Sequence, residues 1–357
     1  MRYSSFEKNI IQNISNAIPD VTPGVLVRAY YMGRLICDVS VGSTQPYYDL
    51  ASLTKIVFTQ QAMMSAFDQK LWSLDSKVID FLPDFFDTEI KVTSLLTHTS
   101  GLDWWKPFFT ELSGSLKDGW IAQRLRMYTY LNRAENKIQA EGVKAVYSDL
   151  GFLLLGYTLE KMHQKNILNV WNDLKDKHYS HTSFDFNLNN QLLYPENLYA
   201  PTEFCQYRNK TLRGEVHDEN TWSMGGISTH AGLFGSIDDV ASYGLMVRSQ
   251  LQGIANYSIK LKTAQLFATR AIPETVGDFS LGYMMPSDIS PSCGSQFSKK
   301  SIGHTGFTGT SVWYDQNTDF LVTILSNRVY YGRENKAYIQ LRPQIHNWLY
   351  EAIRKLG

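Results

Sequence analysis

Ser52-Leu-Thr-Lys55 is the most informative stretch of this chain, because it places a hydroxyl and an amine three residues apart. Residues at this spacing share one face of a helix, so we expect the Ser52 hydroxyl beside the Lys55 amine. A serine hydroxyl is a weak nucleophile until a neighbouring base takes its proton. The spacing therefore predicts an activated serine.

The surrounding residues distinguish this stretch from a second copy of the spacing, Ser5-Phe-Glu-Lys8, which we interpret as an exposed helix face. Ser52 follows the short apolar approach Tyr47-Tyr-Asp-Leu-Ala51. It also opens a helical pattern of apolar residues: Ile56, Val57, Met63, Met64 and Phe67. Ser52 is thus expected at a helix N-terminus, where free backbone N–H groups and the helix dipole favour negative charge.

Hydrophobic periodicity predicts the other elements. They are a helix over 4–18, a hairpin of strands 25–31 and 35–41, short helices over 92–98 and 150–161, strands over 310–315 and 320–326, and a last helix over 336–355. Residues 273–299 are rich in Gly, Pro and Ser, which predicts a long exposed loop.

Strands at both ends of the chain around a helical middle predict an α/β (α+β) fold. The expected architecture is one antiparallel sheet built from both termini and flanked by helices, with a helical insertion. Residues 1–75 and 220–357 are assigned to a discontinuous sheet domain, and 76–219 to a mainly helical domain. The active site is expected between the two.

Composition narrows the class of protein. The chain has 357 residues, with 43% hydrophobic and 19% charged residues, which is ordinary for a globular protein. The 34 basic and 34 acidic residues cancel, so no basic footprint for nucleic acid is visible. No apolar run approaches the length of a membrane span.

The cysteines and the N-terminus suggest a compartment. Cys37, Cys205 and Cys293 are widely spaced and are expected as buried free thiols rather than a disulfide framework or a zinc site. The stretch Met1–Asn9 lacks the apolar core of a secretory signal, so a cytoplasmic protein is expected. The alternative is an exported protein whose signal has been removed.

Tyr147-Ser148-Asp149 precedes the apolar segment Leu150–Leu155 and is the second candidate group. A tyrosine has an ordinary pKa near ~10, and a nearby Lys55 ammonium is expected to lower it. A Tyr147–Lys55 pair is then a base for Ser52 near neutral pH. The alternative is a tyrosine whose ring fills the helix junction and whose hydroxyl is merely hydrogen-bonded.

Gly303-His304-Thr305-Gly306-Phe307-Thr-Gly309 is the third candidate group. Glycines at a strand edge permit close approach of a ligand to the backbone. A backbone N–H near Phe307, together with that of Ser52, is expected to form an oxyanion hole. The alternative is a glycine-rich bulge with a satisfied histidine.

These three groups, in this order, resemble the motifs of the serine β-lactamase and penicillin-binding-protein superfamily. The closer resemblance is to the branch of class C β-lactamases, D-alanyl-D-alanine carboxypeptidases and esterases, and it covers roughly residues 20 to 330. Further stretches support it: Leu95–Leu102, Tyr147–Gly156, Gly303–Asp315, and Glu215–Asp218 followed by Gly225-Gly226 and His230–Phe234. The resemblance implies a β-lactamase-like fold.

The resemblance also implies roles for the catalytic residues. Ser52 is the acylated nucleophile, Lys55 aids its deprotonation, and Tyr147 is the base for acylation. The implied activity is a serine hydrolase that cleaves an amide or ester through an acyl-enzyme on Ser52, without a metal or other cofactor.

On the substrate side, the resemblance implies roles for Asp149, His304, Thr305, Gly306 and Phe307. Asp149 stands where the family often has Asn, and is expected to orient substrate or to pair with Lys55. His304 replaces the usual Lys and is largely neutral at pH 7 if unperturbed, so a substrate carboxylate loses a permanent cation.

The expected substrate is a small molecule or short peptide, and the expected activity is that of a penicillin-binding-protein-like D-amino-acid peptidase or carboxypeptidase on cell-wall fragments. The alternatives are a carboxylesterase or weak β-lactamase and, in another class, a non-catalytic binding protein that retains the fold. The oligomeric state stays open.

Three weaker candidates each have an ordinary interpretation. Trp104, Trp105, Phe108 and Phe109 either wall the substrate cleft or pack the helical region. A metal site could be formed by His217, Asp218 and His230, but their spacing is not the tight spacing of metal ligands. Hydrogen bonding within a loop is therefore the preferred interpretation. His98 is interpreted as a structural turn residue.

Overall fold

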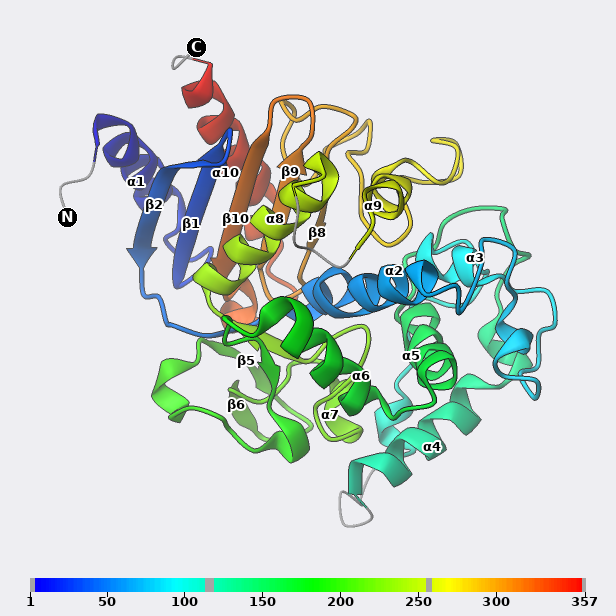
Figure 1. Cartoon of the computed structure of the whole chain (residues 1–357). Helices are drawn as coiled ribbons and strands as arrows, with labels where there is room; N and C mark the ends of the chain where they lie inside the picture. The colour runs from blue at the N-terminus through cyan, green and yellow to red at the C-terminus, as the bar shows by residue number, and fades with distance from the viewer. Residues whose placement is uncertain (1–3, 113–118, 255–258, 355–357) are drawn as a thin grey trace.

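The computed structural model describes residues 4–112, 119–254 and 259–354. Figure 1 shows a sheet with helices packed on it and a mostly helical region beside it. The strands in these ranges are β1 (Gly24–Tyr31), β2 (Arg34–Gly42), β3 (Tyr48–Asp49), β4 (Asp185–Phe186), β5 (Pro201–Cys205), β6 (Lys210–Arg213), β7 (Leu233–Gly235), β8 (Ile302–Thr305), β9 (Ser311–Asp315) and β10 (Phe320–Ser326). The α-helices are α1 (Ser5–Ala17), α2 (Gln61–Asp68), α3 (Val92–Leu96), α4 (Gly119–Leu131), α5 (Asp149–His163), α6 (Ile167–Leu174), α7 (Glu219–Ser223), α8 (Ile237–Gln252), α9 (Leu261–Ala268) and α10 (Ala337–Ile353).

The main sheet of the described residues has five strands in the order β2-β1-β10-β9-β8, and neighbouring strands are antiparallel. The N-terminal strand β1 pairs with β10 near the C-terminus, with Val25 opposite Ser326. The prediction of one antiparallel sheet built from both ends of the chain is confirmed, as are the predicted hairpin of 25–31 with 35–41 and the predicted strands over 310–315 and 320–326.

Alternation along the strands divides the core between the two faces of this sheet. On one face, Val27 and Ile324 pack with Ile14 of α1 and with residues of α10. On the other face, Leu321 packs in a cluster that includes Tyr243 of α8. Figure 1 shows α8 crossing the sheet on the side opposite to α1 and α10.

The predicted helices of the middle and end of the chain are present with small shifts. α3 ends at Leu96 rather than 98, because His98 adopts a positive φ of 59°. α5 begins after Ser148, whose side chain accepts the N–H of Gly151 at 3.0 Å. α10 ends at Ile353, and residue 355 of the prediction lies outside the described residues. The assignment of 76–219 to a separate helical domain stays a prediction.

The segment 273–299 differs from its prediction. It contains no helix or strand, but Leu281, Tyr283 and Cys293 are buried, so the prediction of an exposed loop was wrong for much of it. Met284 exchanges backbone hydrogen bonds with Gly303 of β8 at 2.9 and 3.1 Å. The segment therefore lies along the free edge of the sheet and covers backbone groups that would otherwise be unpaired.

Two predictions about the chain as a whole can be compared with the structure. Cys37, Cys205 and Cys293 are free and buried, as expected. Throughout the described ranges, every helix is too short or too polar to cross a lipid bilayer.

Candidate active site

Ser52 lies in a strained turn between β3 and α2. The helix begins at the predicted place but not as an α-helix: a 3₁₀ turn, Ala51–Leu53, is followed by a π-helical segment, Lys55–Gln60. Ala51 has a φ of +47°, and its N–H is held by Asp49 Oδ1 at 2.8 Å. Non-glycine residues in this conformation cost about 1–3 kcal/mol and cluster at functional sites. The turn leaves Ser52 partly exposed.

Lys55 is fully buried and connects Ser52 to the rest of the site. Its ammonium donates to Ser52 Oγ at 3.1 Å, to Asp149 Oδ1 at 2.6 Å and to the His230 carbonyl at 3.2 Å. Burial lowers the pKa of Lys55, but Asp149 and Tyr147 outweigh burial and hold that pKa above its ordinary value. Lys55 is therefore a cation that the Asp149 carboxylate holds in place.

Tyr147 lies against Lys55, with Lys55 Nζ 4.8 Å from the centre of its ring. Burial raises the pKa of the phenol, and Asp149 adds to this effect. Lys55 and a hydrogen bond from Ser52 lower the pKa but do not offset the rise. The expectation that Lys55 brings this pKa below its ordinary value was wrong, because the sequence could not show how strongly the phenol is desolvated. The raised pKa favours the phenol over the phenolate, so the phenolate that would act as a base is the minor form of Tyr147 at neutral pH.

His98 supports the ring of Tyr147 and is the structural turn residue that the sequence indicates. Its Nδ1 accepts the backbone N–H of Ser148 at 2.9 Å, and its ring centre lies 4.6 Å from that of Tyr147. Burial, with Lys55 adding to the effect, lowers the pKa of His98 well below its usual range. The neutral imidazole thus fixes the entry to α5 and the position of the phenol.

His304 lies behind Tyr147 and not on an exposed surface. Its side chain is 0% exposed, its ring centre is 5.8 Å from that of Tyr147, and its Nδ1 is 2.8 Å from the Thr305 carbonyl. Burial, with Lys55 adding to the effect, lowers the pKa of His304 to about 3. In this conformation the imidazole is enclosed and packs against the ring of Tyr147, and the substrate-side role of His304 stays a prediction. The substrate-side roles of Thr305 and Phe307 stay predictions.

Gly306 is where the end of β8 meets the Ser52 turn. A Cβ at this position would lie 2.1 Å from Thr310 Oγ1 and 2.6 Å from the Leu50 carbonyl oxygen. A close approach that requires a glycine here is therefore already made by the backbone two residues before Ser52, and the approach of a ligand at Gly306 stays a prediction.

Phe307 presents what an oxyanion donor needs. Its ring is 46% exposed, and its backbone N–H has no hydrogen-bond partner within the described part of the chain. Its carbonyl accepts from Arg328 Nε at 2.8 Å, which fixes the peptide. The neighbouring Thr308 Oγ1 donates to the Asp49 carbonyl at 2.7 Å, so this segment packs against the turn that carries Ser52, and the role of the Phe307 N–H as an oxyanion donor stays a prediction.

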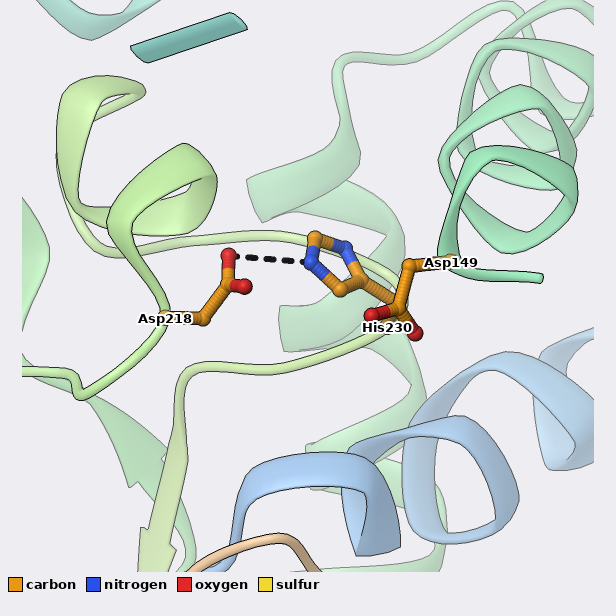
Figure 2. Close-up of side chains that lie close together, drawn as sticks. All are labelled: Asp149, Asp218 and His230. Carbon is orange, nitrogen blue, oxygen red and sulfur yellow. Dashed lines mark hydrogen bonds and ion pairs between the residues drawn. The ribbon is translucent and has the colours of Figure 1, made fainter. Parts of the chain in front are cut away.

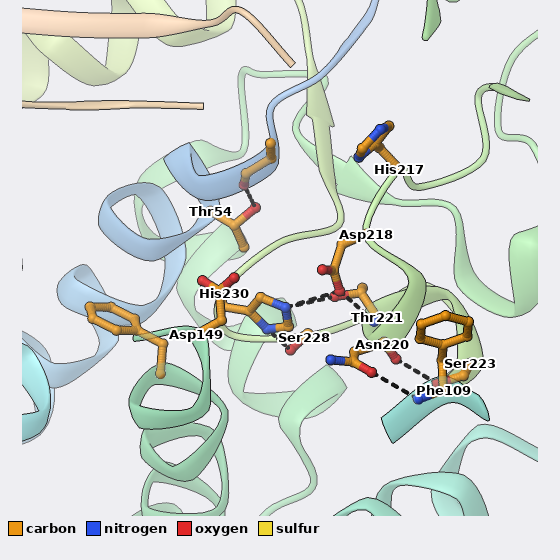
Figure 3. A network of polar contacts seen from close by, with 12 residues as sticks. Thr54, Phe109, Asp149, His217, Asp218, Asn220, Thr221, Ser223, Ser228 and His230 are labelled. Atoms are coloured by element: carbon orange, nitrogen blue, oxygen red, sulfur yellow. Dashed lines mark hydrogen bonds and ion pairs between the residues drawn. The ribbon is translucent and has the colours of Figure 1, made fainter. Parts of the chain in front are cut away.

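A second polar group lies next to Asp149. His230 Nε2 is 3.0 Å from Asp218 Oδ1 (Figure 2), and His230 Nδ1 is 2.8 Å from Ser228 Oγ. Figure 3 shows both neighbours of the ring. Asp218 also accepts the N–H of Thr221 at 2.7 Å and so caps α7. Burial raises the pKa of Asp218, but His230 and Thr221 outweigh burial and hold it well below its usual range. The hydrogen-bonding interpretation of these two residues is confirmed.

Asp149, Asp218 and His230 are also the described residues best placed to hold a metal ion, since their ligand atoms lie within 4.8 Å of one another (Figure 2). Lys55 already supplies a cation to Asp149, and Asp218 already accepts from His230. A divalent ion would have to displace both contacts, so the donor set fits the ammonium better. His217 points away from this cluster, with its Nε2 3.0 Å from Glu203 Oε1.

Comparison with protein families decides the class of the protein. A family model described as Beta-lactamase matches residues 15–344. The chain belongs to the β-lactamase family. The resemblance and the β-lactamase-like fold that the sequence indicates are thereby confirmed, and the protein is a serine hydrolase.

Curated relatives of this β-lactamase family member are named as an amidase and as putative carboxypeptidases. "N-acetylmuramyl-L-alanine amidase" of Bacillus subtilis (strain 168) is 29% identical, over 90% of this chain and 80% of its own length. Proteins named "Putative D-alanyl-D-alanine carboxypeptidase" from Salmonella agona (strain SL483) and Escherichia coli (strain K12) are each 27% identical over 84% of this chain, and over 74% and 73% of their own lengths.

Solved structures similar to this β-lactamase family member share its fold. EstCE1, described as a hydrolase with promiscuous acyltransferase activity, has a TM-score of 0.69 at 18% identity, covering 97% of this chain and 98% of its own. The octameric penicillin-binding protein homologue from Pyrococcus abyssi has a TM-score of 0.66 at 17% identity, covering 96% and 77%.

In this β-lactamase-family site, Asp218 and His230 lie close to Asp149, which the sequence did not indicate. The stretches containing Asp218 and His230 were part of the resemblance, but nothing in their spacing placed them beside Asp149. Their proximity depends on the loop before β7, where Thr59 Oγ1 donates to the Thr229 carbonyl at 2.5 Å. Only the folded structure brings these segments together.

Replacing Asp149 with asparagine is expected to move the acidic limb of the rate profile to lower pH. A carboxylate beside Tyr147 raises the phenol's pKa because it disfavours the phenolate, so removing the charge lowers that pKa. Asparagine retains an oxygen for Lys55, and the Lys55 pKa falls for the same reason. The measurement is kcat/KM for an activated ester against pH; an unmoved or raised midpoint would contradict the assignment of Tyr147 as the base.

Replacing Gly306 with alanine is expected to destabilise the fold by about 1–3 kcal/mol, because the added methyl overlaps the Leu50 carbonyl. The Ser52 turn should shift with it, so labelling by a fluorophosphonate should slow. Thermal unfolding and labelling rate measure the two effects. Gly151→Ala is the matched control, since a Cβ there meets nothing closer than 3.7 Å. If both variants had the same unfolding temperature and labelling rate, the contact between Gly306 and Leu50 would not constrain the Ser52 turn.

Proposed function

We propose that this serine hydrolase cleaves amide bonds in small cell-wall fragments by way of an acyl-enzyme on Ser52. The observation that carries the proposal is the placement of Lys55 Nζ, 3.1 Å from Ser52 Oγ and 2.6 Å from Asp149, against the ring of Tyr147. The names of the curated relatives, an amidase and carboxypeptidases, support amide substrates from the cell wall.

The steps follow from the charges of the site. Tyr147 in its phenolate form takes the proton of Ser52, whose oxygen forms a bond to the carbonyl carbon. The oxyanion lies toward the N–H groups of Phe307 and Ser52. Tyr147 then gives its proton to the departing amine as the C–N bond breaks. Water hydrolyses the ester to release the acid.

His304 indicates which amide bonds suit the site. A carboxypeptidase must bind the free carboxylate next to its scissile bond, and a cation is the usual partner for that group. Here the residue at the cation's position is neutral and enclosed. The proposal therefore moves from the D-alanyl-D-alanine carboxypeptidase that the sequence favoured toward an amidase whose scissile bond has no free carboxylate beside it.

The test is turnover of three substrates by the full chain: an acyl-L-alanyl peptide, an acyl-D-Ala-D-Ala peptide and a short p-nitrophenyl ester. We expect release of a primary amine from the first, faster than from the second, and none with Ser52→Ala. Turnover of the ester alone would contradict the proposal and would indicate a carboxylesterase. The absence of both turnover and a covalent adduct would indicate a binding protein that has kept the fold.

A further inference from the structure

Five aromatic side chains form a connected surface from two separate segments of the chain. The ring centres of Trp104 and Trp105 are 5.7 Å apart, those of Trp105 and Phe109 6.3 Å, those of Phe109 and Tyr207 4.9 Å, and those of Tyr207 and Trp222 6.1 Å. We call these five residues the aromatic rim. The contact between Phe109 and Tyr207 joins the two segments.

The rim is not ordinary core packing. Trp104 is 60% exposed and Tyr207 is 48% exposed, and the other three rings are partly exposed. Phe108, by contrast, is buried, so the packing interpretation holds for that residue alone. Contiguous exposed aromatic surface on a soluble domain typically marks a binding site.

The segment 104–109 of the rim is joined to residues of the candidate site at both of its ends. The Asp149 N–H donates to the Trp104 carbonyl at 2.8 Å. The Phe109 N–H donates to Asn220 Oδ1 at 2.9 Å, and Asn220 lies in α7, which also carries Trp222 and which Asp218 caps (Figure 3). The rim is thus hydrogen-bonded to the same elements that position Asp149 and Asp218.

The charged side chain that packs on the rim, that of Arg208, favours a ligand with a neutral face. Arg208 lies 5.0 Å from the centre of the Trp222 ring, but its guanidinium already donates to Glu215 at 3.0 Å and to the Val216 and His217 carbonyls at 2.7 and 2.8 Å. Its charge is therefore satisfied inside the protein. The rim offers flat aromatic faces, with the hydroxyl of Tyr207 and the indole N–H groups as its polar edges.

A pyranose ring matches this surface, since it has a flat C–H face and hydroxyl groups at its edge. We propose that the aromatic rim binds the sugar ring of an N-acylated amino sugar whose acid side arm carries the scissile amide. This inference rests on the proposed function and specifies its acyl group: the side-arm carbonyl forms an ester with Ser52 Oγ, the amide C–N bond breaks, and the peptide leaves as an amine with the proton from Ser52. Water then restores the free acid of the sugar.

The test compares two amides that differ only in the sugar: N-acetylmuramyl-L-alanyl-D-isoglutamine and its lactyl counterpart without the ring. We expect Trp104→Ala and Tyr207→Ala to lower kcat/KM for the sugar-bearing amide about ten- to a hundredfold and to leave the lactyl amide unchanged. Trp104→Phe should recover part of the loss. Ile289→Ala, at an 85% exposed position outside the rim, is the control.

Equal losses on the two amides, or no loss on the sugar-bearing one, would overturn the inference. So would a loss confined to a long-chain ester, because the rim would then hold an acyl chain. Failure of the proposed function is distinguishable, since the unmodified protein would then hydrolyse neither amide. In that case a fluorescence titration of Ser52→Ala with N-acetylmuramyl-L-alanine still reports on the rim, and a signal that is unchanged by Trp104→Phe would contradict binding there.

Discussion

Ser52→Ala is expected to lower the rate of hydrolysis by about 10⁴-fold or more and to abolish labelling by a fluorophosphonate, because the variant removes the oxygen on which we propose that the acyl-enzyme forms. The fold should persist, since Ser52 is partly exposed and its hydroxyl interacts with Lys55 and Tyr147 of the candidate site. Intact-protein mass spectrometry detects the adduct, and release of the primary amine measures turnover.

The chain supplies its own control for this prediction. Ser5 and Lys8 repeat the spacing of Ser52 and Lys55 on the exposed face of α1, where Ser5 has no contact with the site. The Ser5→Ala variant should be labelled by the fluorophosphonate and should hydrolyse the substrate as fast as the unmodified protein. An adduct that survives in Ser52→Ala would show that the nucleophile lies elsewhere.

Tyr147→Phe is expected to lower kcat by about 10²–10⁴-fold, the range typical of a lost general base. The variant keeps the ring that packs against His98 and His304 and removes only the hydroxyl. The free energy of unfolding should therefore change by no more than about 1 kcal/mol. The rise in rate with pH that reports ionisation of the phenol should disappear with it.

Tyr130 is a matched control for Tyr147, because Tyr130-Leu-Asn132 follows the same Tyr-x-Asn/Asp pattern outside the site. Tyr130→Phe should leave both the rate and its pH dependence unchanged. If Tyr147→Phe retained full activity, Lys55 would have to act as the base, and the raised pKa of its ammonium makes that role costly at neutral pH.

The parts of the structure that follow from local pattern could be predicted from the sequence. The β-branched and aliphatic runs 25–31 and 320–326 predicted two strands, which pair in one sheet, and the three-residue spacing predicted Ser52 beside Lys55. These features depend on neighbours along the chain or on the period of the element. The order of the motifs then allowed the family to be recognised.

The rest depends on burial and on contacts between distant segments. The raised pKa of Tyr147 results from its desolvation, which no spacing reveals. Likewise, Asp218 and His230 reach Asp149 only through the packing of loops. The segment 273–299 has the composition of an exposed loop, yet it is partly buried because the free edge of β8 needs a partner.

The pairing of β1 with β10 has a consequence for how the protein folds. Val25 must meet Ser326, so almost the whole chain has to be synthesised before the centre of the sheet can close. Until then the β1–β2 hairpin has an unpaired edge, and such edges invite association with other chains. Contacts of this sequence separation also slow folding. We therefore expect the helical middle of the chain to collapse first on the ribosome and the sheet to be completed last.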